Sequence, residues 1–237
     1  CKEENLKMVG INIGNIKNES LNTLKNNWGT GVLIHICFFL ISLLLEVLNS
    51  LEELVFNQVE NSLLLLLIFL VIFIIMNISL TNANVMGSLK CFLELAKGNK
   101  LEVKHYSFGF NYMFTAFRVG GAFCLFTFLW SLLLVIPGII KSISYSMSLL
   151  IAIEYPEISG REALKLSMKI TDGYKWDIFL LGLSFIGWII LCVLTLGIGF
   201  LWLSSYIDTA YCILYLKLKR NRIELFEELD SEKEIYL

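Results

Sequence analysis

Hydrophobic residues along the chain fall into long apolar blocks, which short polar and charged segments separate. Two of these blocks carry almost no charge. The block 119–155 contains Lys141 and Glu154 as its charged residues, and the block 178–216 contains Asp208. A helix needs about 20 apolar residues to cross a bilayer. Each block is about twice that length, so each predicts two membrane spans joined by a tight turn.

Helix-disrupting residues lie near the middle of both blocks. Pro137-Gly138 interrupts the first, and Gly197-Ile198-Gly199 interrupts the second. Proline lacks a backbone donor and glycine loosens a helix, so these positions predict the turns. Two shorter apolar runs, 30–47 and 62–80, predict two further spans. The pattern therefore predicts an all-α protein, a polytopic membrane bundle of six transmembrane helices.

Composition supports a membrane protein and argues against several other classes. Hydrophobic residues make up 57% of the chain and charged residues 17%, against about 45–50% and 25% in soluble domains. The net charge of -2 gives no reason to expect nucleic acid as a partner. Six cysteines without a C-x-x-C pair, and two histidines, predict neither a disulfide framework nor a metal site. Because the chain begins at Cys1, we expect a trimmed fragment with an unknown number of residues before it.

Basic residues predict the orientation in the membrane, because cytoplasmic loops carry an excess of Lys and Arg. Segment 49–61 has no basic residue, whereas segment 89–104 has four. Basic residues also precede the first predicted span, separate the fourth from the fifth, and follow the sixth; Lys141 is the exception. We therefore predict that both termini are cytoplasmic. The whole chain, 1–237, is predicted to form one integral membrane domain that ends in a charged cytoplasmic tail, 219–237.

An internal repeat is visible in the predicted cytoplasmic segments. Segments 89–100 and 164–175 share four of twelve residues, including a glycine that is expected to end a helix, and 21–28 is a weaker copy. Apolar residues alternate with Lys at helical spacing, which predicts amphipathic helices lying at the interface over 19–28, 88–98 and 160–173. Each would precede a two-span hairpin, giving three parallel units, about 19–80, 88–155 and 160–218. The candidate residues for binding lipid headgroups are Lys90, Lys97, Arg161, Lys165 and Lys169.

Polar residues inside the predicted spans are candidates for function, since ionisable groups are costly in lipid. Asp208 is the deepest acid, and it either couples ion or proton movement or is satisfied by neighbouring hydroxyls such as that of Thr209. His35 in the first span is also a candidate, although its setting favours a hydrogen-bonded packing residue. The complete candidate polar site consists of Asp208, Tyr206, Tyr145, Lys141 and His35.

Several short runs along the chain form a recognisable set: Leu24-Lys25-Asn26-Asn27-Trp28-Gly29, Pro137-Gly138-Ile139-Ile140-Lys141, Tyr145, Met147, Ala163-Leu164-Lys165-Leu166-Ser167, Gly173-Tyr174-Lys175-Trp176, Leu183-Ser184-Phe185-Ile186-Gly187-Trp188, Thr195-Leu196-Gly197-Ile198-Gly199 and Tyr206. Together they resemble a known bacterial family of six-span membrane proteins, called domain of unknown function nine hundred seventy-five. The resemblance extends over residues 28–216. Ser205 departs from it, because the family often has proline there, and so does the long acidic loop after the first span. The resemblance implies a location in the bacterial cytoplasmic membrane and implies no catalytic residues.

Function is less well determined by the sequence than fold. No P-loop, G-x-S-x-G or H-E-x-x-H motif occurs, so we expect a protein that is not an enzyme and that has no cofactor. We expect it to bind membrane lipids, another membrane protein or a peptide, as an exporter accessory or as protection against membrane-active peptides. The alternative is a small transporter that uses Asp208 as its coupling group; an intramembrane lipid-processing enzyme is the third possibility. The sequence gives neither the ligand nor the oligomeric state.

Overall fold

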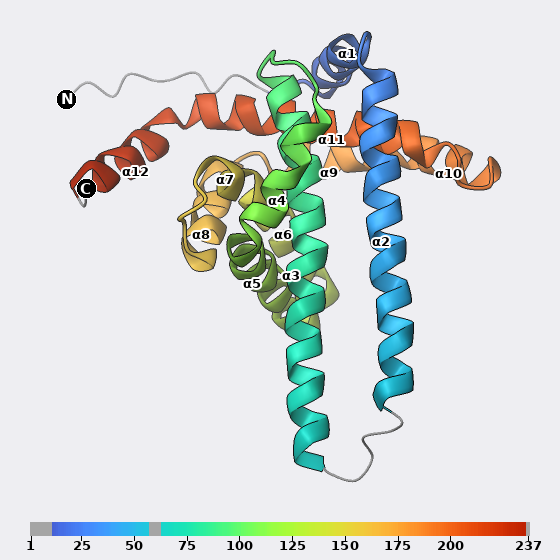
Figure 1. The fold of residues 1–237 in the computed structure, drawn as a ribbon. Helices are drawn as coiled ribbons and strands as arrows, with labels where there is room; N and C mark the ends of the chain where they lie inside the picture. The colour runs from blue at the N-terminus through green and yellow to red at the C-terminus, as the bar shows by residue number, and fades with distance from the viewer. Residues whose placement is uncertain (1–10, 57–62, 236–237) are drawn as a thin grey trace.

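The computed structural model describes residues 11–56 and 63–235, which form helices and connecting turns and contain no strand. The first part consists of α1 (Ile13–Leu24), α2 (Trp28–Phe56), α3 (Leu63–Ala96), η1 (Val103–Ser107) and α4 (Phe108–Asn111). Helices α2 and α3 form a long antiparallel hairpin (Figure 1). At 1.5 Å per residue they are about 44 and 51 Å long, which exceeds the roughly 30 Å of a hydrocarbon core. The predicted loop 49–61 is helical as far as Phe56, and its remainder lies outside the described residues.

The second hairpin consists of α5 (Met113–Leu133) and α6 (Val135–Tyr145), and α7 (Ser148–Glu154) continues it. The chain reverses at Leu134, which has extended backbone angles. The turn predicted at Pro137-Gly138 was therefore placed too late. Pro137 lies in the first turn of α6, where a missing N–H breaks no helical hydrogen bond. A Cβ at Gly138 would come within 2.3 Å of the Ser131 Oγ, so glycine allows the two helices to approach.

The third part consists of α8 (Gly160–Thr171), α9 (Lys175–Leu183), α10 (Ile186–Leu194), α11 (Phe200–Asn221) and α12 (Ile223–Ile235). The turn predicted near Gly197 is confirmed, since Leu196 and Gly197 both have positive φ, 55° and 86°. Figure 1 shows that α10 and α11 run across the α2–α3 hairpin and not alongside it. The arrangement of helices therefore differs from a simple bundle of parallel hairpins.

Within the part of the chain that the structure describes, five segments are long and apolar enough to cross a membrane: Trp28–Val47, Leu70–Ala96, Met113–Leu132, Val135–Glu154 and Lys175–Leu194. Helix α11, which contains most of the predicted sixth span, is not among them. It carries Asp208 and two serines, ends in Lys219 and Arg220, and packs against α1, α2 and α3. The structure thus has membrane-compatible helices, but it confirms neither six spans nor three hairpin units.

The three predicted interfacial helices have different outcomes. Helix α8 begins at a capping box formed by Ser159 and Glu162, and α1 covers part of the predicted segment 19–28. The separate helix predicted over 88–98 is wrong, because these residues continue α3 and bury Phe92 completely. The apolar residues of this stretch pack against α11 and the neighbouring helices instead of lying on a membrane surface. Gly98 and Gly173 have φ of 89° and 84° and follow the ends of α3 and α8, as predicted.

The predicted tail 219–237 is structured as far as residue 235. Lys219 lies in the last turn of α11, and α12 follows it. Phe226 in α12 is 1% exposed and stacks on Tyr155 at a centroid distance of 6.0 Å. An apolar contact therefore holds this charged segment against the rest of the protein.

Polar side chains connect the helices of the first part. Asn84 on α3 donates to the Ser42 Oγ on α2 at 3.1 Å and to the Phe38 carbonyl at 3.3 Å. Its amide oxygen accepts a hydrogen bond from the Tyr106 hydroxyl. Such bonds contribute to helix association in lipid, where the hydrophobic effect gives little driving force.

Candidate functional site

His35 and Asp208 lie together where α11 crosses α2. The His35 Nε2 is 3.3 Å from the Asp208 Oδ2, and Ser88 on α3 donates to the same oxygen at 3.2 Å. Three helices thus converge on one carboxylate oxygen. Among the described residues, Asp208 Oδ1 has no hydrogen-bond or ion-pair partner, and the Asp208 side chain is 25% exposed.

The other ring nitrogen of His35 has two alternative partners. Nδ1 lies 3.2 Å from the Gly31 carbonyl and 3.2 Å from the Ser205 Oγ. In a neutral ring that donates to Asp208 through Nε2, Nδ1 accepts a hydrogen bond from Ser205. In a protonated ring, Nδ1 donates to Gly31. The surroundings therefore satisfy both protonation states without a large movement.

A cavity of about 410 Å³ opens beside this cluster. Most of its wall is apolar, and His35, Ser88, Ser204 and Asp208 supply the polar part; the apolar lining residues are Phe38, Phe39, Val85, Leu89, Phe200 and Leu201. Mainly apolar pockets with a few converging polar groups are typical of small-molecule sites. The Asp208 carboxylate can bind a cation or a hydrogen-bond donor of a ligand. The apolar wall can pack against the hydrophobic part of the same ligand.

The other predicted members of the polar site lie elsewhere. Tyr206 has its hydroxyl 3.5 Å from the Lys17 carbonyl and meets the Phe185 ring edge-on at 5.1 Å. Lys141 and Tyr145 lie together on α6, where the Lys141 ammonium is 4.9 Å from the centroid of a Trp130 ring. The structure therefore brings together His35 and Asp208 but separates them from the other three candidates.

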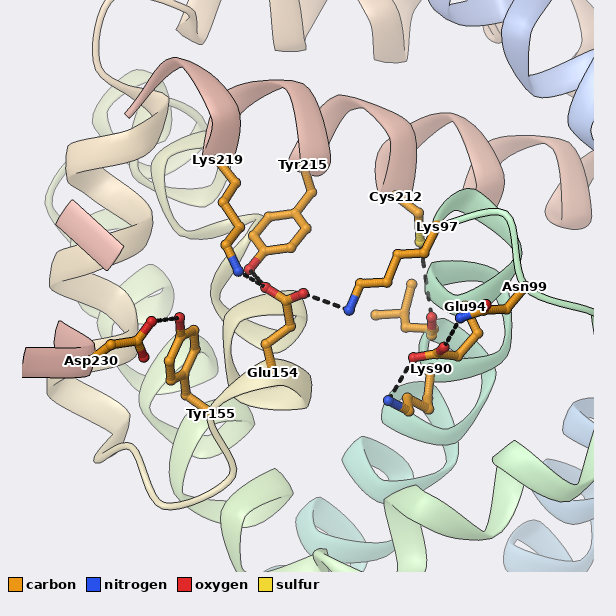
Figure 2. Close-up of polar contacts among 11 residues, drawn as sticks. Lys90, Glu94, Lys97, Asn99, Glu154, Tyr155, Cys212, Tyr215, Lys219 and Asp230 are labelled. Carbon is orange, nitrogen blue, oxygen red and sulfur yellow. Dashed lines mark hydrogen bonds and ion pairs between the residues drawn. The ribbon is translucent and has the colours of Figure 1, made fainter. Parts of the chain in front are cut away.

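A second polar cluster surrounds Glu154, at the end of α7 (Figure 2). Its carboxylate accepts ion-pair contacts of 2.6 Å from both Lys97, just after α3, and Lys219 on α11. Tyr215 donates to it at 2.7 Å. Burial, and then the neighbouring Glu154 carboxylate, raises the pKa of the Tyr215 phenol well above its usual value, so the phenol stays protonated and donates. The cluster joins three parts of the chain.

Ion pairs divide the predicted headgroup-binding residues into two groups. Lys90 pairs with Glu94 at 2.8 Å, and Lys97 pairs with Glu154. Their charge is therefore largely compensated within the protein. Arg161, Lys165 and Lys169 lie exposed on α8 and have no ion pair among the described residues. These three remain candidates for headgroup binding.

Sequence reasoning missed Ser88, Ser205 and the Glu154 cluster. Ser88 fell in a segment that was expected to lie on the membrane surface. Ser205 was visible as a departure from the family pattern, and this signal does coincide with a contact to His35. For the Glu154 cluster the sequence contains no signal, because Lys219 and Glu154 are 65 positions apart and follow no shared periodicity.

Comparison with known proteins gives one match. A family model described as "Protein of unknown function (DUF975)" matches residues 121–222, from α5 to the residue after α11. This range includes Asp208, Glu154 and the Gly197 turn, but not His35 or Ser88. Searches of curated proteins and of solved structures give no match.

Proposed function

From a chain whose residues 121–222 match the DUF975 family model, we propose a non-enzymatic membrane protein that binds an amphipathic molecule carrying a basic group. One observation carries the proposal: a partly exposed carboxylate, with one oxygen unpaired, at the wall of a mainly apolar cavity. A cationic head would meet Asp208, and an apolar body would pack on the phenylalanines. Membrane-active peptides and long-chain amines have this chemistry, so a protective or exporter-associated role fits it.

The membrane setting and orientation belong to this proposal. We expect the chain to lie in the bacterial cytoplasmic membrane, with both termini in the cytoplasm and the α2–α3 tip outside. Support comes from the five apolar segments and from the distribution of basic residues.

Cysteine labelling of intact cells checks the orientation. In a background without the native cysteines, Ser50→Cys should react with a membrane-impermeant maleimide, because 49–61 lacks basic residues. Lys100→Cys should react only after the cells are opened. Both positions are exposed, so accessibility does not limit either reaction. Reaction of Lys100→Cys from outside would overturn the orientation.

Binding of a dansyl-labelled long-chain alkylamine to the purified full chain tests the proposed ligand class. Asp208→Asn should weaken binding at least about tenfold, because a charge-assisted hydrogen bond contributes about 1.5–3 kcal/mol. Asp172→Asn is the matched control, since that carboxylate is 71% exposed and pairs with Lys175. A dansyl alcohol of the same chain length should bind weakly to all three proteins. Equal affinity of wild type and Asp208→Asn for the amine would refute the proposal.

A small transporter coupled through Asp208 is the second candidate function. The observation in its favour is the pair of hydrogen-bond arrangements available to His35, since a site that alternates between protonation states is what coupling needs. Proteoliposomes distinguish the two functions. Net movement of the amine probe together with protons would support transport, whereas binding without movement would support the first proposal.

A further inference from the structure

A second cavity lies on the other side of α11, between α1, α10 and α11. Its volume is about 630 Å³, within the range of about 300–1,000 Å³ that is usual for ligand sites. Three tryptophans, Trp28, Trp188 and Trp202, line it together with Leu21, Leu191, Cys192 and Leu203. Lys17, Asn18 and Tyr206 supply its polar edge. The cavity is thus apolar over most of its wall and carries one cationic group.

Among residues 11–56 and 63–235, no carboxylate pairs with the Lys17 ammonium at this edge. It donates to the Ser184 carbonyl at 3.3 Å and lies 5.0 Å from the centroid of the Phe185 ring. The neighbouring acid, Glu19, is occupied by Lys217 at 2.6 Å. An ammonium has three donors, so Lys17 keeps donors and an uncompensated charge for an anion.

The two halves of this cavity correspond to the two halves of a lipid. Tryptophan is enriched at the level of the headgroups, where its ring is apolar and its N–H is polar. Helix α1, which carries Lys17, lies beside the start of α2 (Figure 1). We propose that this cavity binds an anionic phospholipid, with the phosphate on Lys17 and an acyl chain along the three tryptophans.

This lipid site is distinct from the Asp208 cavity. One face of α11 lines the Asp208 cavity with Phe200, Leu201, Ser204 and Asp208. The tryptophan-lined cavity is instead lined by Trp202, Leu203 and Tyr206 of α11 and by Gly199, which precedes this helix. The two sites therefore share a helix but no lining residue. Loss of lipid binding and loss of amine binding can be separated experimentally.

Native mass spectrometry of the full chain, taken from mixed micelles that contain phosphatidylglycerol or phosphatidylcholine, tests the lipid site. Wild type should retain phosphatidylglycerol preferentially. Lys17→Gln should lower its retention about fivefold, since one basic residue near an anionic lipid surface contributes about 1 kcal/mol. Lys25→Gln is the control, because Lys25 is exposed and does not line the cavity. Glycerol phosphate, which has the headgroup charge without acyl chains, should not displace the lipid.

A cavity-filling variant tests the apolar half without touching Lys17. Leu191→Trp places a larger side chain in the cavity wall and should reduce lipid retention, whereas Leu194→Trp, which is exposed outside the cavity, should not. Circular dichroism and gel filtration establish that the variants fold. Retention of phosphatidylglycerol that is equal in wild type, Lys17→Gln and Leu191→Trp would overturn the proposal, and so would equal retention of both lipids by wild type.

Discussion

Glu154→Ala is expected to lower the free energy of unfolding by about 2–4 kcal/mol. The substitution removes the shared partner of Lys97 and Lys219 and leaves two partly exposed ammonium groups uncompensated. Their side chains are 32% and 22% exposed, and that of Glu154 is 11% exposed. Breaking a buried ion pair costs about 3–5 kcal/mol, and hydrogen bonds to charged groups contribute about 1.5–3 kcal/mol. The partial exposure of the lysines brings the expected value below the sum of these terms.

Reversible unfolding in mixed micelles of a mild detergent and dodecyl sulfate measures this effect. Glu102→Ala is the matched control, because Glu102 forms an ion pair of 2.5 Å with Lys104 at the surface. The side chain of Glu102 is 40% exposed and that of Lys104 is 69% exposed. An exposed pair contributes at most about 1 kcal/mol, so this variant should unfold almost like wild type. Glu154→Gln should fall between the two, because it keeps hydrogen-bonding capacity and loses the charge. If Glu154→Ala and Glu102→Ala unfolded alike, the cluster would not be the junction that its geometry indicates.

Gly109→Ala is expected to destabilise the protein by about 3 kcal/mol or more. A Cβ at this position would lie 1.9 Å from the Ala83 carbonyl oxygen and 2.6 Å from the Gly87 nitrogen, both in the backbone of α3. Neither atom can move without displacing the helix. Overpacking commonly lowers the free energy of unfolding by about 1–3 kcal/mol. A clash with backbone atoms is expected to cost about 3 kcal/mol or more, because the backbone cannot move aside as a side chain can. The packing of α4 on α3 should therefore be lost before the rest of the fold.

Gly187→Ala is the control for the glycine variant. No atom lies within 4 Å of a Cβ built there, and Gly187 lies inside α10. Alanine favours a helix over glycine by about 0.5–1 kcal/mol, so this change should be neutral or slightly stabilising. The same unfolding measurement compares both variants with wild type. A Gly109→Ala protein as stable as Gly187→Ala would show that α4 does not pack on α3 at this distance.

The sequence by itself determined the features that depend on local patterns. Apolar blocks of span length predicted membrane-compatible helices, and five segments of the described chain are long and apolar enough to cross a membrane. Glycines at 98, 173 and 197 predicted helix ends and a turn, because a positive φ is a local property that glycine accommodates. Asp208 was singled out from a local pattern as well, since a charge in an apolar block is visible without a structure.

Tertiary structure decided which of these elements meet. Helix α11 crosses α2 and α3, and this crossing places His35 and Ser88 at one oxygen of Asp208. The crossing depends on packing between residues more than 100 positions apart in the chain. The amphipathic stretch 88–98 was predicted to lie on the membrane surface, but burial against neighbouring helices extends α3 through it. Lys97 was predicted to bind lipid headgroups and Lys219 to begin a charged tail, but both pair with Glu154. The sequence shows where a charged group lies in an apolar segment, but it does not show which residue pairs with that group. The partner is set by the fold, because the two residues are far apart in the chain and share no sequence periodicity.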